Sequence, residues 1–132
     1  METVDTVAFI LIKDNRVLVE RRRMDKETDP GAVVVPGGHI EDGETHIDAL
    51  KRELLEELGV TCNDFRFIAR MPCETETEIQ MNHWYLCEDW AGEPVSTEAE
   101  EIFYIADPSQ LDLPNDRTVI TRVFSEELGS NR

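Results

Sequence analysis

The chain has 132 residues, 40% of them hydrophobic and 32% charged, with 29 acidic against 13 basic side chains and a formal net charge of -16. This length and composition predict one globular domain, residues 1–132, with a core large enough to fold without disulfide bonds or other cross-links. The negative charge excludes a protein that wraps duplex nucleic acid, and no stretch approaches the ~20 apolar residues of a membrane span.

The N-terminal segment predicts two strands joined by a turn. Valine, phenylalanine and isoleucine predominate in residues 3–13 and 17–22, and the polar residues 14–16 separate them. The second strand ends in the basic cluster Arg21, Arg22 and Arg23.

This basic cluster is either a phosphate contact or a solvated strand end. Guanidinium groups suit phosphate oxygens because their planar donors bind two oxygens at once. Side chains alternate along a strand, so Arg22 should face the side opposite to Arg21 and Arg23. The polar loop that follows, residues 24–32, contains Pro30 and Gly31 and is predicted to be mobile enough to close over a ligand.

Residues 38–60, GHIEDGETHIDALKRELLEELGV, predict a glycine-rich turn followed by a helix. Helical spacing gathers an apolar seam on one face and an acidic face beside it. The seam consists of Ile47, Leu50, Leu54 and Leu58, and the acidic face of Glu53, Glu56 and Glu57. Three convergent carboxylates repel one another, and they suit a hard divalent cation that takes oxygen ligands.

The ends of this helix are also encoded locally. Thr45 is placed to cap its N-terminus, and Gly59 stands where a left-handed C-cap is expected. Gly37 and Gly38 predict a tight turn that leaves backbone carbonyls free to bind a ligand. Ala49 lies near the acidic face and is expected to leave room there for a ligand.

Residues 38–60 resemble the Nudix box at each of its fixed positions, read as G-x5-E-x7-R-E-U-x-E-E-x-G-U with U a bulky aliphatic residue. Nine positions at fixed spacing make a specific signal. The matching residues are Gly38, Glu44, Arg52, Glu53, Leu54, Glu56, Glu57, Gly59 and Val60.

The resemblance implies a fold and a set of roles. The fold is an α+β, α/β/α sandwich, with a mixed sheet between helices and the box as its loop-helix-loop. Mg²⁺, with Mn²⁺ as a possible substitute, is the implied cofactor. Its implied ligands are Glu53, Glu56, Glu57 and the Gly37 carbonyl.

The resemblance also implies roles around that cation. Glu53 is the first choice for deprotonating or orienting the attacking water, and Arg52 should hold a carboxylate in place. Glu44 closes the acidic site from the loop, and Gly38 belongs to the substrate-binding turn. MutT-like members of the family carry an arginine pair where this chain has Arg21 and Arg22.

The second half of the chain predicts strands over residues 65–71, 79–87 and 102–105. Trp84 and Tyr85 should point to opposite faces of their strand. The family commonly supplies a further glutamate from the region before the last strand, as a metal ligand or base. Glu101 fits that place first and Glu98 second.

A short helical turn at residues 107–108 and a terminal helix over residues 116–128 close the chain. Asn115 is most simply the N-cap of the terminal helix. In MutT-like proteins an asparagine near this place reads the purine edge, so Asn115 is also a candidate for substrate binding.

Together these features predict a Mg²⁺-dependent hydrolase of a nucleoside diphosphate linked to another moiety, with MutT-like action on a nucleoside triphosphate favoured. An ADP-ribose or dinucleotide polyphosphate pyrophosphatase is an alternative, and a nucleotide-sensing domain without catalysis is another. The expected partner is a small nucleotide, with no membrane or duplex nucleic acid. The three cysteines, which are odd in number and form no CxxC pair, favour a reduced, cytoplasmic location, and we expect a monomer or a homodimer.

Overall fold

The first strand, β1 (Glu2–Ile10), lies inside a four-stranded mixed sheet with the order β5-β1-β7-β6. The computed structural model describes residues 1–128, so the last four residues of the predicted domain lie outside it. Strand β1 is parallel to β7 (Glu78–Glu88) and antiparallel to β5 (Gly37–His39). Strand β6 (Asp64–Glu74) is antiparallel to β7.

A second, antiparallel sheet is built around β3 (Arg16–Arg21). Strand β3 pairs with β2 (Ile12–Lys13), β4 (Val33–Val34) and β8 (Glu101–Ile105). Between β2 and β3 the chain turns through Asp14 and Asn15, whose φ angles of 52° and 61° suit a tight hairpin turn. The predicted turn is therefore present at residues 14–15, whereas Arg16, also assigned to it, is the first residue of β3.

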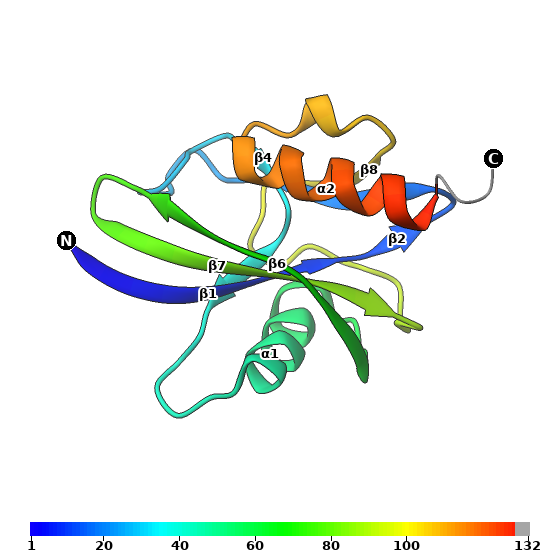
Figure 1. Cartoon of the computed structure of the whole chain (residues 1–132), viewed down its shortest axis with the longest axis horizontal. Helices are drawn as coiled ribbons and strands as arrows, with labels where there is room; N and C mark the ends of the chain where they lie inside the picture. Colours follow the sequence, from blue (N-terminus) through cyan, green and yellow to red (C-terminus); the bar gives the residue numbers. More distant parts are fainter. Residues whose placement is uncertain (129–132) are drawn as a thin grey trace.

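Two α-helices cover opposite sides of the strands, α1 (His46–Leu58) on one side and α2 (Pro114–Glu127) on the other (Figure 1). A single 3₁₀ turn, η1 (Pro108–Gln110), precedes α2 and confirms the short helical turn predicted there. This arrangement confirms the predicted mixed sheet between helices. No helix within residues 1–128 has both the length and the apolar character needed to cross a membrane.

The alternation of side chains along the strands builds one core on each side. Val7 and Phe9 of β1 pack in the cluster that contains the buried face of α1. Ala8 and Ile10, the residues between and after them, pack in the cluster that contains α2. Trp84 is buried with the α2 cluster and Tyr85 packs against the α1 cluster, as the predicted alternation of the two aromatic side chains requires.

Residues 37 and 38 are a strand and not the predicted turn. Gly37 pairs with Ala8 and Gly38 with Val7 across β1. The strands come so close that a Cβ on Gly37 would lie 2.2 Å from the Val7 carbonyl oxygen. Glycine is needed here for this close approach of two backbones, which is a long-range property that the local sequence does not reveal.

Helix α1 begins and ends as predicted, but its buried face is rotated. The Thr45 hydroxyl accepts a hydrogen bond from the Asp48 N–H at 3.1 Å, and Gly59 has a left-handed φ of 67°. Ile47 is 38% exposed, whereas Ala49 is fully buried. Ala49 therefore belongs to the core and leaves no room for a ligand, because the helix rests on the face that carries its smallest residue.

Candidate active site

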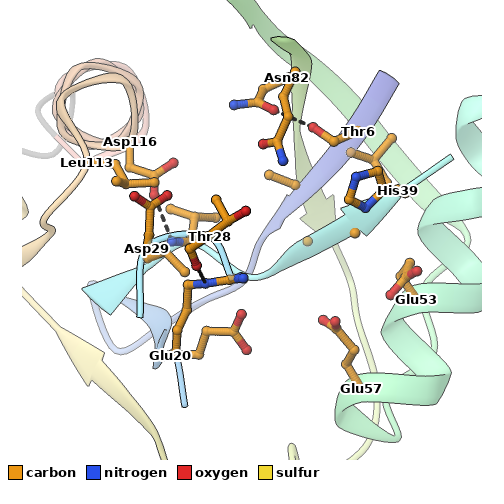
Figure 2. Close-up of a pocket in the computed structure, with 18 of the residues that line it drawn as sticks. Thr6, Glu20, Thr28, Asp29, His39, Glu53, Glu57, Asn82, Leu113 and Asp116 are labelled. Carbon is orange, nitrogen blue, oxygen red and sulfur yellow. Dashed lines mark hydrogen bonds between the residues drawn. The ribbon is translucent and has the colours of Figure 1, made fainter. Parts of the chain in front are cut away.

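One pocket of about 390 Å³ lies between α1, β5, β3 and the start of α2 (Figure 2). One end is acidic and the other is mixed polar and apolar. The acidic end is lined by Glu20, Glu53, Glu56, Glu57 and Glu98. The opposite end is lined by Thr28, Asp29, Asn82, Trp84, Leu113 and Asp116.

Arg52 holds the carboxylates of the acidic end in place through hydrogen bonds. Its guanidinium donates two hydrogen bonds to the Glu44 carboxylate, from Nε at 2.7 Å and from Nη2 at 2.8 Å. Nη1 donates to Oε1 of Glu53 at 2.8 Å and to Glu56 at 3.2 Å, and Nη2 also reaches the His39 carbonyl at 3.1 Å. The planar guanidinium thereby ties the loop before α1 to the acidic face of the helix.

Glu44 and Glu53 both accept hydrogen bonds from Arg52, but their pKa values shift in opposite directions. The hydrogen bonds from Arg52, and then the one from the Glu41 N–H, lower the pKa of the Glu44 carboxyl to about 2. Burial raises the pKa of Glu53, although Arg52 opposes this shift. Glu44 is therefore a fixed anion that orients Arg52, and Glu53 is the carboxylate that Arg52 presents to the pocket.

Glu57 is an acid of the site with a strongly raised pKa and an unpartnered oxygen. Burial, and after it the charges of Glu20, Glu53 and Glu98, raise its pKa to about 9. Its Oε2 atom is buried and has no hydrogen-bond partner. A buried polar atom without a partner is costly, so this oxygen is suited to an external cation.

The backbone of β5 also fits a cation site beside these acids. A Cβ on Gly38 would lie 2.4 Å from the carboxyl carbon of Glu53, so only glycine leaves that carboxylate its place. Gly37 lines the same pocket. Among the described residues, no three acidic, histidine or cysteine side chains converge closely enough to hold an ion as they stand. Arg52 donates hydrogen bonds to both Glu53 and Glu56 on this side of the site.

Of the predicted arginine pair, the structure brings Arg22 to the pocket and not Arg21. Arg22 lines it and donates from Nε to the Thr28 carbonyl at 2.8 Å. Arg21 instead pairs with Glu101 at 3.0 Å, where both side chains are roughly half exposed. The predicted alternation holds for Arg21 and Arg22 but not for Arg23, which lines a small pocket together with Arg22. The assignment of Arg21 to substrate binding is not supported by its position.

Glu98, the second choice before the last strand, occupies the place expected for Glu101. Glu101 lies in β8 opposite Arg21, so it faces away from the pocket. Glu98 lies in the preceding loop and lines the acidic end. Thr97 fixes that loop, because its hydroxyl donates to the Glu56 carbonyl at 2.8 Å near the end of α1.

Asn115 neither caps α2 nor reaches the pocket. The helix begins at Pro114, one residue earlier than a cap at Asn115 requires, and its cap position is Leu113. The Asn115 amide donates to the Pro72 carbonyl at 3.0 Å and ties α2 to β6. Asp116, the next residue, lines the pocket in its place.

Asp116 is a buried carboxylate with two donors. Val35 donates its N–H to Oδ2 and Trp84 donates its indole N–H to Oδ1, each at 3.0 Å. Burial nevertheless raises the pKa of Asp116 to about 6, because these two hydrogen bonds only partly offset the lost hydration. This side chain links α2, β7 and the β4 segment at the polar end.

Several lining residues, Glu20 and Asp116 among them, were not predicted from the sequence. Glu20 carried a usable signal, since an acid at the end of an apolar strand shares a face with Arg22. Asp116 carried none, because its burial depends on how α2 docks on β7. Gln80 and Asn82, on one face of β7, also line the pocket.

The NUDIX domain model matches residues 2–128. The chain therefore belongs to the Nudix hydrolase family, whose members generally use divalent metal cations.

Two bacterial relatives are similar to this chain over part of its length. It is 35% identical to the 8-oxo-dGTP diphosphatase of Escherichia coli strain K12 over 95 residues, 71% of this chain and 72% of that protein. It is 34% identical to the 8-oxo-dGTP diphosphatase of Haemophilus influenzae over 84 residues, 64% of this chain and 62% of the relative. The latter match thus spans less than two thirds of that relative.

Among solved structures, the MutT NUDIX hydrolase from Burkholderia pseudomallei has the same fold. Its TM-score is 0.81 at 22% identity, with 93% of this chain and 99% of that chain covered. At this identity the likeness concerns the fold alone.

Proposed function

We propose that this Nudix hydrolase cleaves a pyrophosphate bond of a nucleoside triphosphate with the help of Mg²⁺. The observation that carries the proposal is a single pocket with gathered carboxylates at one end and hydrogen-bonding groups beside an indole at the other. A nucleotide has the same division, with phosphates at one end and a base at the other. The relatives named 8-oxo-dGTP diphosphatase support this substrate class.

The residues at the acidic end fit a divalent cation. Glu53, Glu57 and Glu98, with the Gly37 carbonyl, would hold it, and Glu56 lines the same wall. The unpartnered Glu57 oxygen is the feature that fits best, since oxygen ligands are what Mg²⁺ prefers. When bound, such a cation neutralises phosphate charge and lowers the pKa of water toward ~7.

The protein's own residues supply orientation and proton transfer. Arg52 holds Oε1 of Glu53 at 2.8 Å and makes no hydrogen bond to Oε2. We assign Oε2 to accept a proton from the attacking water, which adds to one phosphorus as the bridging P–O bond breaks. Arg22, on the facing wall, would contact phosphate oxygens as a charge-assisted donor.

The polar end is assigned to the nucleoside. Trp84 is 1% exposed and lines the pocket, and Asn82 and Asp29 line the same pocket with hydrogen-bonding groups (Figure 2). These groups would bind the edge of a base and thereby determine which nucleotide fits. The retained box glutamates favour catalysis over nucleotide sensing, because a sensor has no use for a proton acceptor.

A screen of nucleotides with Mg²⁺ tests the proposal. We expect one or a few nucleoside triphosphates to be hydrolysed, with release of pyrophosphate in preference to phosphate, and activity to vanish in EDTA and return with Mg²⁺ or Mn²⁺. Glu53→Gln protein purified in parallel is the control for contaminating phosphatases. Hydrolysis that persists in EDTA, or that Glu53→Gln retains in full, would refute the proposed function.

A further inference from the structure

Glu20 is a buried acid of the pocket that lies outside the Nudix box. It is on β3, is 9% exposed, and lines the wall opposite α1. Figure 2 shows the carboxylates of Glu20 and Glu57 pointing toward one another across the pocket. Within residues 1–128, the Glu20 carboxylate has neither a hydrogen-bond donor nor an ion-pair partner.

Two nearby cations do not satisfy Glu20. Arg22 shares its strand face but directs its Nε to the Thr28 carbonyl at 2.8 Å. Lys26 lines the same pocket and, within the described part of the chain, forms no ion pair with Glu20. Both lie near enough to affect its titration without closing a contact.

Asp116 is a buried carboxylate whose two oxygens both have hydrogen-bond donors within the protein. Its two oxygens accept hydrogen bonds from the Val35 N–H and the Trp84 indole, both at 3.0 Å. Glu20, 9% exposed against 5% for Asp116, receives no such donor in the described structure. Burying a carboxylate without compensation is unfavourable, so its oxygens are suited to a group that enters from the pocket.

We propose that Glu20 is an additional divalent-cation ligand, which binds from β3 the cation that Glu57 approaches from α1. This inference rests on the metal requirement of the proposed function and adds to it a carboxylate from the opposite wall. A divalent cation is the fitting occupant because it would face carboxylates on both sides, where an anion would be repelled. Glu20 would then bind the cation, and Arg22, two residues further along, would bind the phosphate beside it.

Metal binding without nucleotide tests this inference. Free Mn²⁺ is titrated by electron paramagnetic resonance against the full chain, its Glu20→Gln variant and the control Glu100→Gln. Glu100 is exposed and does not line the pocket, so its substitution removes the same charge elsewhere. We expect Glu20→Gln to bind Mn²⁺ at least tenfold more weakly or with one ion fewer, and Glu100→Gln to bind like wild type.

Thermal unfolding provides a second readout that does not depend on activity. In EDTA we expect Glu20→Gln to melt above wild type, because a buried charge without a partner has been removed. With Mn²⁺ we expect the melting temperature of wild type to rise more than that of the variant. If Glu20→Gln does not fold, Glu20→Thr, which has high strand propensity and no charge, supplies the same comparison.

The outcomes separate this inference from the proposed function. Wild-type Mn²⁺ affinity and stoichiometry in the Glu20 variants would overturn the role of Glu20 and leave the proposed hydrolase intact. Failure of the wild-type chain itself to bind Mn²⁺ would overturn both.

Discussion

Replacing Arg22 by alanine removes the guanidinium that faces the proposed phosphate site from the residue after β3. Its Nε bond to the Thr28 carbonyl, at 2.8 Å, holds the side chain along the pocket wall. A hydrogen bond to a charged partner contributes roughly 1.5–3 kcal/mol, so loss of a phosphate contact should raise KM by about tenfold to a hundredfold or somewhat more.

Arg21→Ala is the matched control for this variant. It removes the same charge from the neighbouring residue, the last of β3, together with an ion pair to Glu101 in which both side chains are about half exposed. Such exposed pairs contribute roughly 0–1 kcal/mol to stability, and Arg21 does not line the pocket. We therefore expect its KM to stay within about threefold of wild type, a change of less than 1 kcal/mol.

The assay is steady-state release of pyrophosphate from the best substrate at fixed Mg²⁺, at two salt concentrations. A specific contact predicts a KM ratio between the two variants that persists in high salt, whereas a general effect of charge would be screened. Equal KM values for the two variants, or an unchanged KM for Arg22→Ala, would refute the placement of phosphate beside Arg22.

Three further predictions concern other parts of the site. Glu53→Gln should lower kcat by roughly a hundred- to ten-thousandfold, the usual contribution of a proton acceptor, and should not lower the melting temperature, because it removes repulsion within a buried acidic group; an unfolded variant would contradict this. Arg52→Lys should lower kcat at an unchanged fold, since one ammonium cannot bind Glu44 on two sides and Glu53 as well; kinetics with circular dichroism check it. Burial raises the pKa of Asp116 to about 6 from 3.8. The protonated side chain therefore stabilises the folded state below pH 4. This stabilisation, on the order of 3 kcal/mol, is lost as the pH rises through 6. Thermal melts in EDTA should show this loss between pH 4 and pH 7 in wild type and a smaller one in Asp116→Asn; parallel curves would contradict it.

The sequence predicts the part of the site that is encoded within one helix. Thr45 and Gly59 determine the two ends of α1 through local hydrogen bonding and backbone conformation, so both were found. The acidic face follows from helical spacing alone. Strand alternation likewise separates Arg22 from Arg21, because it depends only on the order of residues along β3.

The remaining assignments failed where the answer depends on residues far apart in the chain. Gly37 is in a strand because β1 approaches it, and Glu98 faces the pocket because Thr97 docks its loop on the end of α1. Asp116 replaces Asn115 in the pocket because α2 begins at Pro114, and a shift of one residue turns a helical side chain by about 100°. None of these contacts can be inferred from local composition.

The bond between Trp84 and Asp116 gives the pocket a built-in optical reporter. The Trp84 indole is 1% exposed, donates to a pocket carboxylate at 3.0 Å and forms part of the wall assigned to the nucleoside. Indole emission responds to the charge and hydration around its N–H, so entry of a base should alter the fluorescence of Trp84. Trp90, the second tryptophan, packs against the α1 core on the other side of the sheet and would contribute a constant background. Nucleotide occupancy could thus be followed in the unlabelled protein, even in a variant that no longer turns over its substrate.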